Sequence, residues 1–270
     1  MAHSGAEQTH DGDAGRKLPF SFRSRADHLV EDYLDAICSD LGLTPQTCNV
    51  LDWGCGLGGS VFWLRQRGYN CFGVDINPSF VENGQACLAE RGADPNVLSV
   101  LEKGRHASFP DGHFHFVFSE SVLEHCEDLS AVGGEMSRLT MPSGGGVHRF
   151  PGRWQPIEGH LLMPFVHWLP CGLPQRLALR ACTCLSIGSD WGWPRRSLAE
   201  RLALADHMYD MWTSGTFYRP ARYVAGAFTD AGFVVRYLPG NRAAVNQSRP
   251  LAVWLRTNFR TAAMLVRKPS

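Results

Sequence analysis

Hydrophobic positions along the first 150 residues alternate between helical and strand spacing. Val30, Leu34 and Ile37 recur at the interval of one helix face, which predicts an amphipathic helix over residues 26–41 that ends at Gly42. Short apolar runs bounded by turn residues predict strands at residues 49–54, 70–75, 96–103, 113–120 and 146–150. Helical spacing lies between these runs, over residues 60–67, 78–91 and 129–139. Strands that alternate with helices through short loops indicate an α/β fold: a doubly wound, mostly parallel sheet covered by helices on both faces.

The alternation stops at about residue 151. Residues 151–215 are rich in Trp, Pro and Leu and contain no clear strand pattern, so we predict a helical insertion. Sheet elements resume as a helix over residues 221–232, a strand over 233–239 and a last strand over 263–269. The first residues are small and polar, as in a disordered tail. The expected organisation is a tail at 1–24, a core formed by 25–150 and 216–270, and the helical insertion at 151–215.

Four glycines follow the first predicted strand, in the segment NVLDWGCGLGGS at residues 49–60. Gly54, Gly56 and Gly59 satisfy the spacing G-x-G-x-x-G of dinucleotide-binding turns. Gly54, Gly56 and Gly58 equally satisfy G-x-G-x-G. A turn with so few side chains predicts close approach of the backbone to a ligand. The glycine spacing alone fits NAD and S-adenosylmethionine equally well.

Two acidic residues beside this turn favour a ligand without phosphate. Asp52 lies at the end of the first strand, where its charge would repel the pyrophosphate of a dinucleotide. S-Adenosylmethionine carries no phosphate, and its ammonium and sulfonium groups are positive. Asp75 ends the second strand, where a carboxylate can accept hydrogen bonds from both ribose hydroxyls. The two acids therefore favour the methyl donor.

Five segments support this interpretation: VLDWGCGLGG, GVDIN, FPDGHFHFVFSESVLEH, PSGGG and YRPARYVAGAFTDAGF. With these segments the chain resembles the class I S-adenosylmethionine-dependent methyltransferases of the small-molecule type, over roughly residues 25–150 and 216–268. The resemblance implies a Rossmann-like fold, S-adenosyl-L-methionine as the cofactor and methyl transfer as the reaction. By similarity, Asp52, Gly54, Gly56 and Gly58 would form the methionine pocket, Asp75 with Ile76 would hold the ribose, and Ser119 with Glu120 would line the site after the fourth strand.

Two positions depart from the family pattern. His115 occupies the place in the fourth strand where the family often has Asp. The family also often has an acidic residue after the third strand for the adenine amine; here the stretch is EKGRHAS, in which Glu102 or His106 is the candidate substitute. Glu124 and His125, in VLEH, are interpreted as supports of their loop rather than as catalytic groups.

The composition restricts the kinds of partner. Lys plus Arg and Asp plus Glu both number 26, so no net positive field attracts nucleic acid. The nine cysteines form no C-x-x-C pair, so we predict neither a metal site nor a disulfide framework, but reduced thiols in a cytoplasmic protein. No segment reaches the roughly 18 uninterrupted apolar residues of a membrane span, and the start has no apolar signal segment.

These observations lead to three hypotheses for the function. The leading one is a methyltransferase that acts on a small-molecule acceptor, with the insertion as a substrate lid. The segment HLLMPFVHWLP and the residues Trp154, Trp191 and Trp193 fit an apolar pocket or a contact with a membrane surface, and by analogy a sugar-linked or lipid-like acceptor. A core-packing or dimer-forming insertion fits the same residues, so a monomer and a homodimer are both compatible. The other hypotheses are an NAD-dependent oxidoreductase and a non-catalytic S-adenosylmethionine-binding module.

Two histidines in the insertion are candidates for the general base that an oxygen nucleophile usually needs. His160 and His167 are seven positions apart and would share one face of a helix, with Glu158 placed to orient an imidazole. Pro164 lies between them and opposes that helix. The alternative is that both histidines are half-buried structural residues of the lid.

Overall fold

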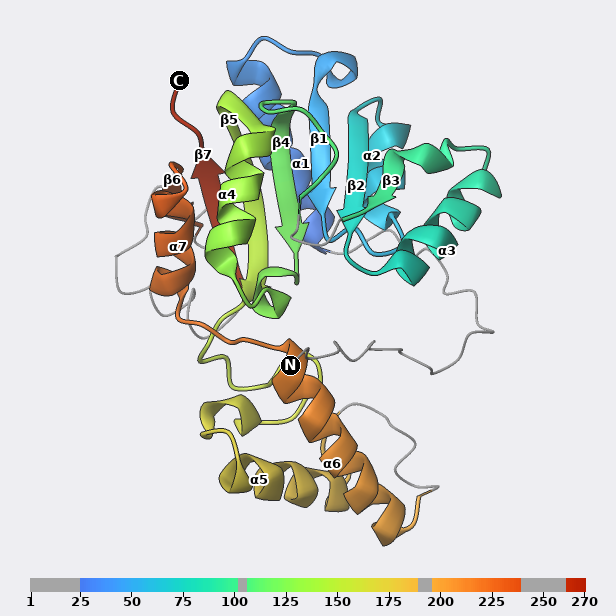
Figure 1. The fold of residues 1–270 in the computed structure, drawn as a ribbon, viewed down its shortest axis with the longest axis vertical. Coiled ribbons are helices and arrows are strands. Elements are labelled where there is room, and N and C mark those ends of the chain that lie inside the picture. Colours follow the sequence, from blue (N-terminus) through green and yellow to red (C-terminus); the bar gives the residue numbers. More distant parts are fainter. Residues whose placement is uncertain (1–24, 102–105, 189–195, 239–260) are drawn as a thin grey trace, which may run out of the picture.

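The computed structural model describes residues 25–101, 106–188, 196–238 and 261–270, with side chains from residue 29 onward. It contains one seven-stranded sheet with the strand order β3-β2-β1-β4-β5-β7-β6 (Figure 1). The strands are β1 (Asn49–Trp53), β2 (Asn70–Asp75), β3 (Leu98–Val100), β4 (Phe114–Glu120), β5 (Thr140–Pro151), β6 (Val234–Tyr237) and β7 (Thr261–Arg267). Neighbours among β1 to β5 pair in parallel, whereas β7 is antiparallel to β5 and β6. The predicted doubly wound, mostly parallel α/β sheet is confirmed.

Helices cover both faces of the sheet. One face carries α1 (Arg25–Asp40), α2 (Gly59–Gln66) and α3 (Pro78–Ala89), and the other carries α4 (Leu129–Leu139) and α7 (Ala221–Asp230). Figure 1 shows α4 and α7 in front of the sheet and α1 behind it. Successive side chains of a strand point to opposite faces, so β1 contributes to both cores. Val50 packs in the core of α1 to α3, whereas Leu51 packs in the core of α4 and α7.

β5 is longer than the sequence pattern predicts. It begins at Thr140, directly after α4, so the glycines of PSGGG lie inside the strand and not in a turn. A Cβ on Gly146 would lie 1.8 Å from the Val117 carbonyl oxygen of β4, and one on Gly145 would lie 2.5 Å from the Val266 oxygen of β7. Glycine is therefore required here because both neighbouring strands approach the backbone closely. The predicted end of the helix at residue 139 agrees with α4, whereas the predicted start of the strand at Gly146 is too late.

Residues 152–188 and 196–215 form a small helical unit that we call the helical cap. Its helices α5 (Leu173–Cys184) and α6 (Leu198–Gly215) pack around a separate apolar core that includes Leu179, Met208 and Trp212. Figure 1 shows the cap at the edge of the sheet where β1, β2 and β4 end. No helix in the described part of the chain has both the length and the apolar composition needed to cross a membrane.

The segment between β5 and α5 does not form the helix on which His160 and His167 would share a face. His160 lies in a turn, and His167 lies in the short 3-10 helix η4 (Val166–Trp168). The Glu158 carboxylate accepts hydrogen bonds from the backbone N–H of His160, at 2.9 Å, and of the next residue, so it closes the turn. Pro164 cannot donate a backbone hydrogen bond and also opposes a helix. The predicted common helix face is therefore wrong.

Candidate functional site

The glycine turn between β1 and α2 is packed against the protein on one side and open on the other. Gly54, Gly56 and Gly58 have φ angles of +83°, +53° and +76°, a region that favours glycine. The Gly54 N–H donates to the Val74 carbonyl oxygen at 2.8 Å, which fixes the turn to β2. A Cβ on Gly54 would lie 2.3 Å from the Val122 side chain, whereas one on Gly56 would meet nothing within 4 Å. The open side at Gly56 is where a ligand can approach the backbone.

Asp75 ends β2 beside this turn and fixes its geometry. Its Oδ2 accepts a hydrogen bond from the Gly56 N–H at 2.8 Å, and its Oδ1 accepts one from the Asn77 N–H at 2.9 Å. Asn77, and not Asp75, caps α3. A carboxylate oxygen has two lone pairs, so each oxygen of Asp75 keeps an acceptor position for a ligand hydroxyl. Ile76, which follows, is 66% exposed at the same edge.

Asp52 gives the turn a second acidic neighbour. It lies on β1 and is only 5% exposed. A carboxylate this close to the glycine turn suits a ligand with positive charge and opposes one with a pyrophosphate. The residues of the turn therefore fit S-adenosylmethionine better than a dinucleotide.

Ser119 and Glu120 interact with β5. Ser119 is 1% exposed, and its Oγ lies 2.9 Å from Nδ1 of His148. Glu120 forms an ion pair with Arg149. The side chains of both residues thus contact the neighbouring strand.

The two departures from the family pattern have different surroundings. The Asn49 N–H donates to Nδ1 of His115 at 2.9 Å, so this histidine fastens the start of β1 to β4. His106 lies on the surface with Nδ1 3.3 Å from a carboxylate oxygen of Glu135 in α4. Four further predictions, on Glu102, Trp191, Trp193 and the tail at 1–24, lie outside the described residues.

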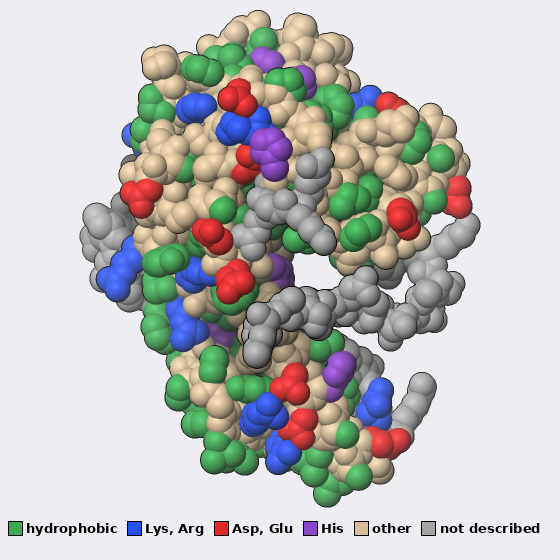
Figure 2. All heavy atoms as spheres, in the orientation of Figure 1, with side chains coloured by type: hydrophobic (Ala, Val, Ile, Leu, Met, Phe, Trp, Pro, Cys, Tyr) green, Lys and Arg blue, Asp and Glu red, His purple; other side chains and the backbone are tan. Residues whose placement is uncertain are grey.

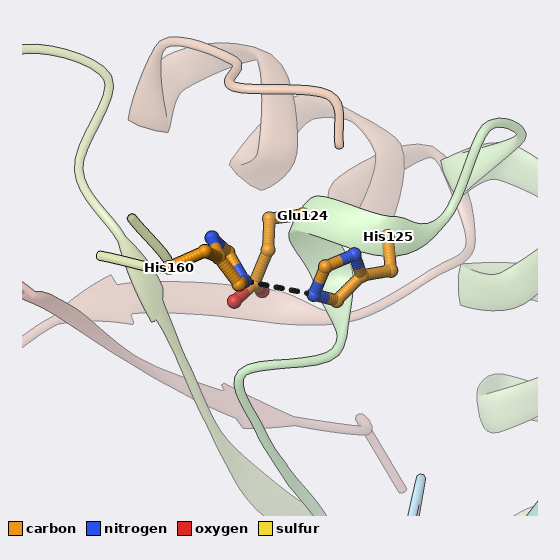
Figure 3. A group of neighbouring side chains, drawn as sticks. All are labelled: Glu124, His125 and His160. Atoms are coloured by element: carbon orange, nitrogen blue, oxygen red, sulfur yellow. Dashed lines mark hydrogen bonds between the residues drawn. The ribbon is translucent and has the colours of Figure 1, made fainter. Parts of the chain in front are cut away.

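A second polar cluster joins the sheet to the cap. Glu124 and His125 lie in the 3-10 helix η3 (Leu123–His125) after β4, and His160 comes from the cap (Figure 3). His125 Nε2 and His160 Nε2 are 3.0 Å apart, and the ligand atoms of all three residues lie within 4.8 Å of one another. Val122, two residues before Glu124, packs against Gly54. The loop that carries Glu124 and His125 therefore starts beside the glycine turn.

Both histidines of the cluster are held through Nδ1. His125 Nδ1 lies 2.7 Å from the Gly215 carbonyl oxygen at the end of α6. His160 Nδ1 lies 2.8 Å from Oε1 of Glu158, which is itself completely buried. The Tyr218 hydroxyl donates to the same Glu158 oxygen and lies 3.0 Å from His160 Nδ1. These contacts leave both Nε2 atoms directed at each other, as Figure 3 shows.

The surroundings move the pKa values of the cluster in opposite directions. Burial raises the pKa of Glu124 to about 7. Burial also opposes ionisation of Glu158, but hydrogen bonds from His160, Tyr218 and the backbone outweigh it and lower its pKa to about 2. The hydrogen bond to Glu158 raises the pKa of His160 despite burial, whereas burial lowers the pKa of His125. Groups with such perturbed values are typical of functional sites.

His167 has a structural setting. It is 2% exposed, and burial lowers its pKa to about 4. Its ring packs against Tyr218, with 4.9 Å between the ring centroids. The partner of His160 is therefore His125, which the sequence interpretation treated as a loop support. The signal for the pair was the recurrence of acid and histidine in LEH at 123–125 and EGH at 158–160.

The sheet and the glycine turn define an α/β domain of the class that binds an adenosyl cofactor beside the ends of its strands. Residues 51–147 match the protein family described as methyltransferase domain. Residues 51–147 therefore form a methyltransferase domain, and its sheet and glycine turn are of the class I S-adenosylmethionine-dependent type.

Named proteins with similar sequences and structures are also methyltransferases. The chain is 33% identical over 142 residues to "Probable tocopherol O-methyltransferase, chloroplastic" of Oryza sativa subsp. japonica, covering 50% of this chain and 39% of that protein. It is 26% identical over 202 residues to norajmaline N-methyltransferase of Rauvolfia serpentina, covering 74% and 66%. The chain thus spans about two fifths to two thirds of these relatives.

Solved structures agree on the fold. Geranyl diphosphate C-methyltransferase from Streptomyces coelicolor A3(2), solved with Mg²⁺, geranyl diphosphate and S-adenosyl-L-homocysteine, superposes with a TM-score of 0.53. The match covers 91% of this chain and 77% of that chain at 14% sequence identity. At this identity the likeness supports the architecture and not the substrate.

Proposed function

We propose that the protein transfers the methyl group of S-adenosyl-L-methionine to a small-molecule acceptor. The observation that carries this proposal is the glycine turn, open at Gly56 and flanked by Asp52 and Asp75. The bound cofactor supplies a methyl group already activated by its sulfonium. Asp52 would attract the positive methionine end, and Asp75 would hold the ribose. Because the methyl carbon is activated, orienting the acceptor in line with it accounts for much of the catalysis.

The acceptor would bind between the glycine turn and the helical cap, which acts as a substrate lid. Figure 2 shows a recess on the molecular surface between the sheet and the cap. The cap carries exposed apolar side chains, among them Trp154, Leu162 and Phe165 at 37%, 53% and 49% exposure. This surface supports an acceptor with an extended apolar part, and one of the relatives is named for tocopherol. Contact of the cap with a membrane surface is a further property that the same side chains support.

His160 is the residue that we expect to act on the acceptor. It is partly exposed, it is oriented by the buried carboxylate of Glu158, and it faces His125 beside the glycine turn. His167 is too buried to meet an acceptor, so we assign it to the support of the cap. The relatives named above are oxygen, nitrogen and carbon methyltransferases, and the site residues do not select among these acceptor atoms.

Calorimetric titration tests the cofactor directly. The full chain should bind S-adenosylmethionine and S-adenosylhomocysteine, and it should bind NAD far more weakly. Tight binding of NAD without binding of the methyl donor would contradict the proposal and support an oxidoreductase. Incubation with radiolabelled methyl donor and metabolite pools then identifies the acceptor. Cofactor binding with no transfer to any pool would favour a non-catalytic module.

Substitution of His160 tests its part in catalysis. His160→Gln should lower turnover by on the order of 10²–10⁴-fold, because the group beside the acceptor is lost, and cofactor affinity should not change. His207→Gln, at an exposed position of α6 in the same cap, is the matched control and should keep full turnover. Full activity of His160→Gln would exclude His160 from the reaction and would leave the orientation of the acceptor as the source of catalysis.

We also propose a cytoplasmic location and a monomer or homodimer. All nine cysteines, including the buried Cys38 and Cys48, are free thiols, which supports a reducing compartment. Gel filtration measures the oligomeric state, and a larger assembly would contradict this proposal.

A further inference from the structure

The contact between His125 and His160 lacks a hydrogen-bond donor if both imidazole rings are neutral. His125 Nδ1 faces the Gly215 carbonyl oxygen, and His160 Nδ1 faces the Glu158 carboxylate. Both partners accept hydrogen bonds, so both Nδ1 atoms carry the proton. In neutral imidazoles the two Nε2 atoms then present lone pairs to each other across 3.0 Å. Such a contact needs a positive species between the two atoms.

Glu124, the third member of the cluster, also needs a positively charged partner. Glu124 is 4% exposed, and neither of its carboxylate oxygens has a hydrogen-bond partner among the residues that the structure describes. A buried carboxylate without a partner is costly, and a bound cation removes that cost. Because one oxygen of Glu124 and one ring nitrogen of each histidine lie within 4.8 Å of one another, one cation can serve all three residues.

The geometry and the donor set agree with a transition-metal ion. Two nitrogens bound to one tetrahedral zinc at about 2.0–2.1 Å lie about 3.3 Å apart, close to the separation seen here. Two imidazoles and one carboxylate, with one position left open, form the ligand set of several catalytic zinc sites. Mg²⁺ and Ca²⁺ prefer oxygen ligands and fit this set poorly.

The surroundings also have the form of a metal site. A ligating histidine usually donates its other N–H to a carboxylate or a backbone carbonyl, which fixes the ring and its tautomer. His160 has the buried Glu158 in this position, and His125 has the Gly215 carbonyl oxygen. Both supports are in place in the described structure.

We propose that Glu124, His125 and His160 bind one divalent transition-metal ion of the zinc type, with an open coordination position toward the acceptor. The site goes beyond the sequence interpretation, which expected no metal because it searched for cysteines and for ligands close in sequence. Metal binding stands independently of methyl transfer. Only its role in catalysis, binding an oxygen or nitrogen of the acceptor, rests on the proposed function, and with the ion bound His160 acts on the acceptor through the ion. An oxygen bound to such an ion loses its proton more easily than a free hydroxyl.

Titration of the metal-stripped full chain with ZnCl₂ tests the proposal. The chain should bind one Zn²⁺, and MgCl₂ should bind far more weakly. Glu124→Gln and His160→Gln should each weaken Zn²⁺ binding by more than the roughly 10- to 100-fold typical of losing a supporting group. Glu158→Gln replaces the charged support of His160 by a neutral amide and should weaken Zn²⁺ binding by a factor within that roughly 10- to 100-fold range. His207→Gln is the control and should bind Zn²⁺ like the parent chain.

Two results would overturn the metal site. One is that the parent chain binds no Zn²⁺, in which case a shared proton holds the two histidines together. The other is that binding is equal in all variants, which would place the ion elsewhere. If Glu124→Gln does not fold, Glu158→Gln and His160→Gln still decide between these outcomes.

Titration with S-adenosylmethionine on the same samples separates the two proposals. All variants should keep the cofactor affinity of the parent chain, because none of them touches the glycine turn. Zn²⁺ binding without cofactor binding would refute the proposed function and leave the metal site standing. Cofactor binding and methyl transfer that persist in the metal-stripped chain, with no Zn²⁺ bound on titration, would refute the metal site alone.

Discussion

The Asp75 carboxylate holds the glycine turn through hydrogen bonds and is also the expected acceptor for the ribose hydroxyls. Asp75→Ala should weaken S-adenosylmethionine binding by about 1–3 kcal/mol, or roughly 5- to 150-fold, because the ribose hydroxyls lose a charged partner. It should also lower thermal stability, since the N–H groups of Gly56 and Asn77 lose their acceptor. Calorimetry and thermal unfolding measure the two effects. Asp94→Ala, at an exposed cap far along the chain, is the control, and equal affinity in both variants would contradict the ribose role.

His148 makes stability depend on pH. It is completely buried, and burial lowers its pKa to about 3. The unfolded chain therefore binds a proton below pH 6.5 that the folded chain does not bind, so stability is present above pH 6.5 and is lost as pH falls toward 3. Each pH unit in this window costs about 1.4 kcal/mol per group, or roughly 2 kcal/mol between pH 6.5 and 5.0.

The variant His148→Gln isolates this contribution. Urea unfolding at pH 7 and pH 5 should show a loss of stability that is smaller by about 2 kcal/mol than in the parent chain. His207→Gln is the control for replacing an exposed histidine. An unchanged difference between the two pH values would show that His148 does not cause it.

The glycines of β5 show how the same residue acts differently in a strand and in a helix. Gly146→Ala should destabilise the fold by at least the 1–3 kcal/mol typical of overpacking, because its Cβ would lie 1.8 Å from the backbone of β4. Gly134→Ala, on the exposed side of α4, has nothing within 4 Å of the new Cβ and should stabilise by about 0.5–1 kcal/mol. Chemical denaturation of both variants measures the contrast. Similar stabilities would refute the close packing of β5.

Sequence patterns predicted the elements that depend on local chemistry. The runs before Gly54 and Asp75 became β1 and β2, since buried parallel strands are continuously apolar and end at turns. The start of β5 was predicted too late, at Gly146, because glycines needed for strand packing, such as Gly144 and Gly145, look like a turn in sequence. The pairing of His125 with His160 was also missed, because it depends on how the cap returns to the sheet. The acid–histidine segments LEH and EGH mark both histidines as candidates, but they do not show that the two segments meet.

At the scale of the whole molecule, the segment after α6 fastens the cap to the loop after β4. The Phe217 N–H donates to the Glu124 carbonyl oxygen at 2.6 Å, and Arg219 donates to the carbonyl oxygens of Cys126 and Glu127 at 2.7 and 2.6 Å. Arg219→Ala should therefore loosen the cap and raise KM for the acceptor several-fold, because acceptor binding needs the cap in place, while leaving cofactor affinity unchanged. Steady-state kinetics and calorimetry measure the two. A rise in cofactor Kd alone would contradict this role.

The position of the two histidines on different bodies has a thermodynamic consequence. His125 lies in η3 after the sheet strand β4 and His160 lies in the cap, so any species bound by both is a cross-link between sheet and cap. By linkage, such a species favours the closed cap by the same factor by which closure raises its affinity. Product release is then coupled to cap opening. The free energy by which the bound species stabilises the closed cap must be overcome before the next turnover can begin.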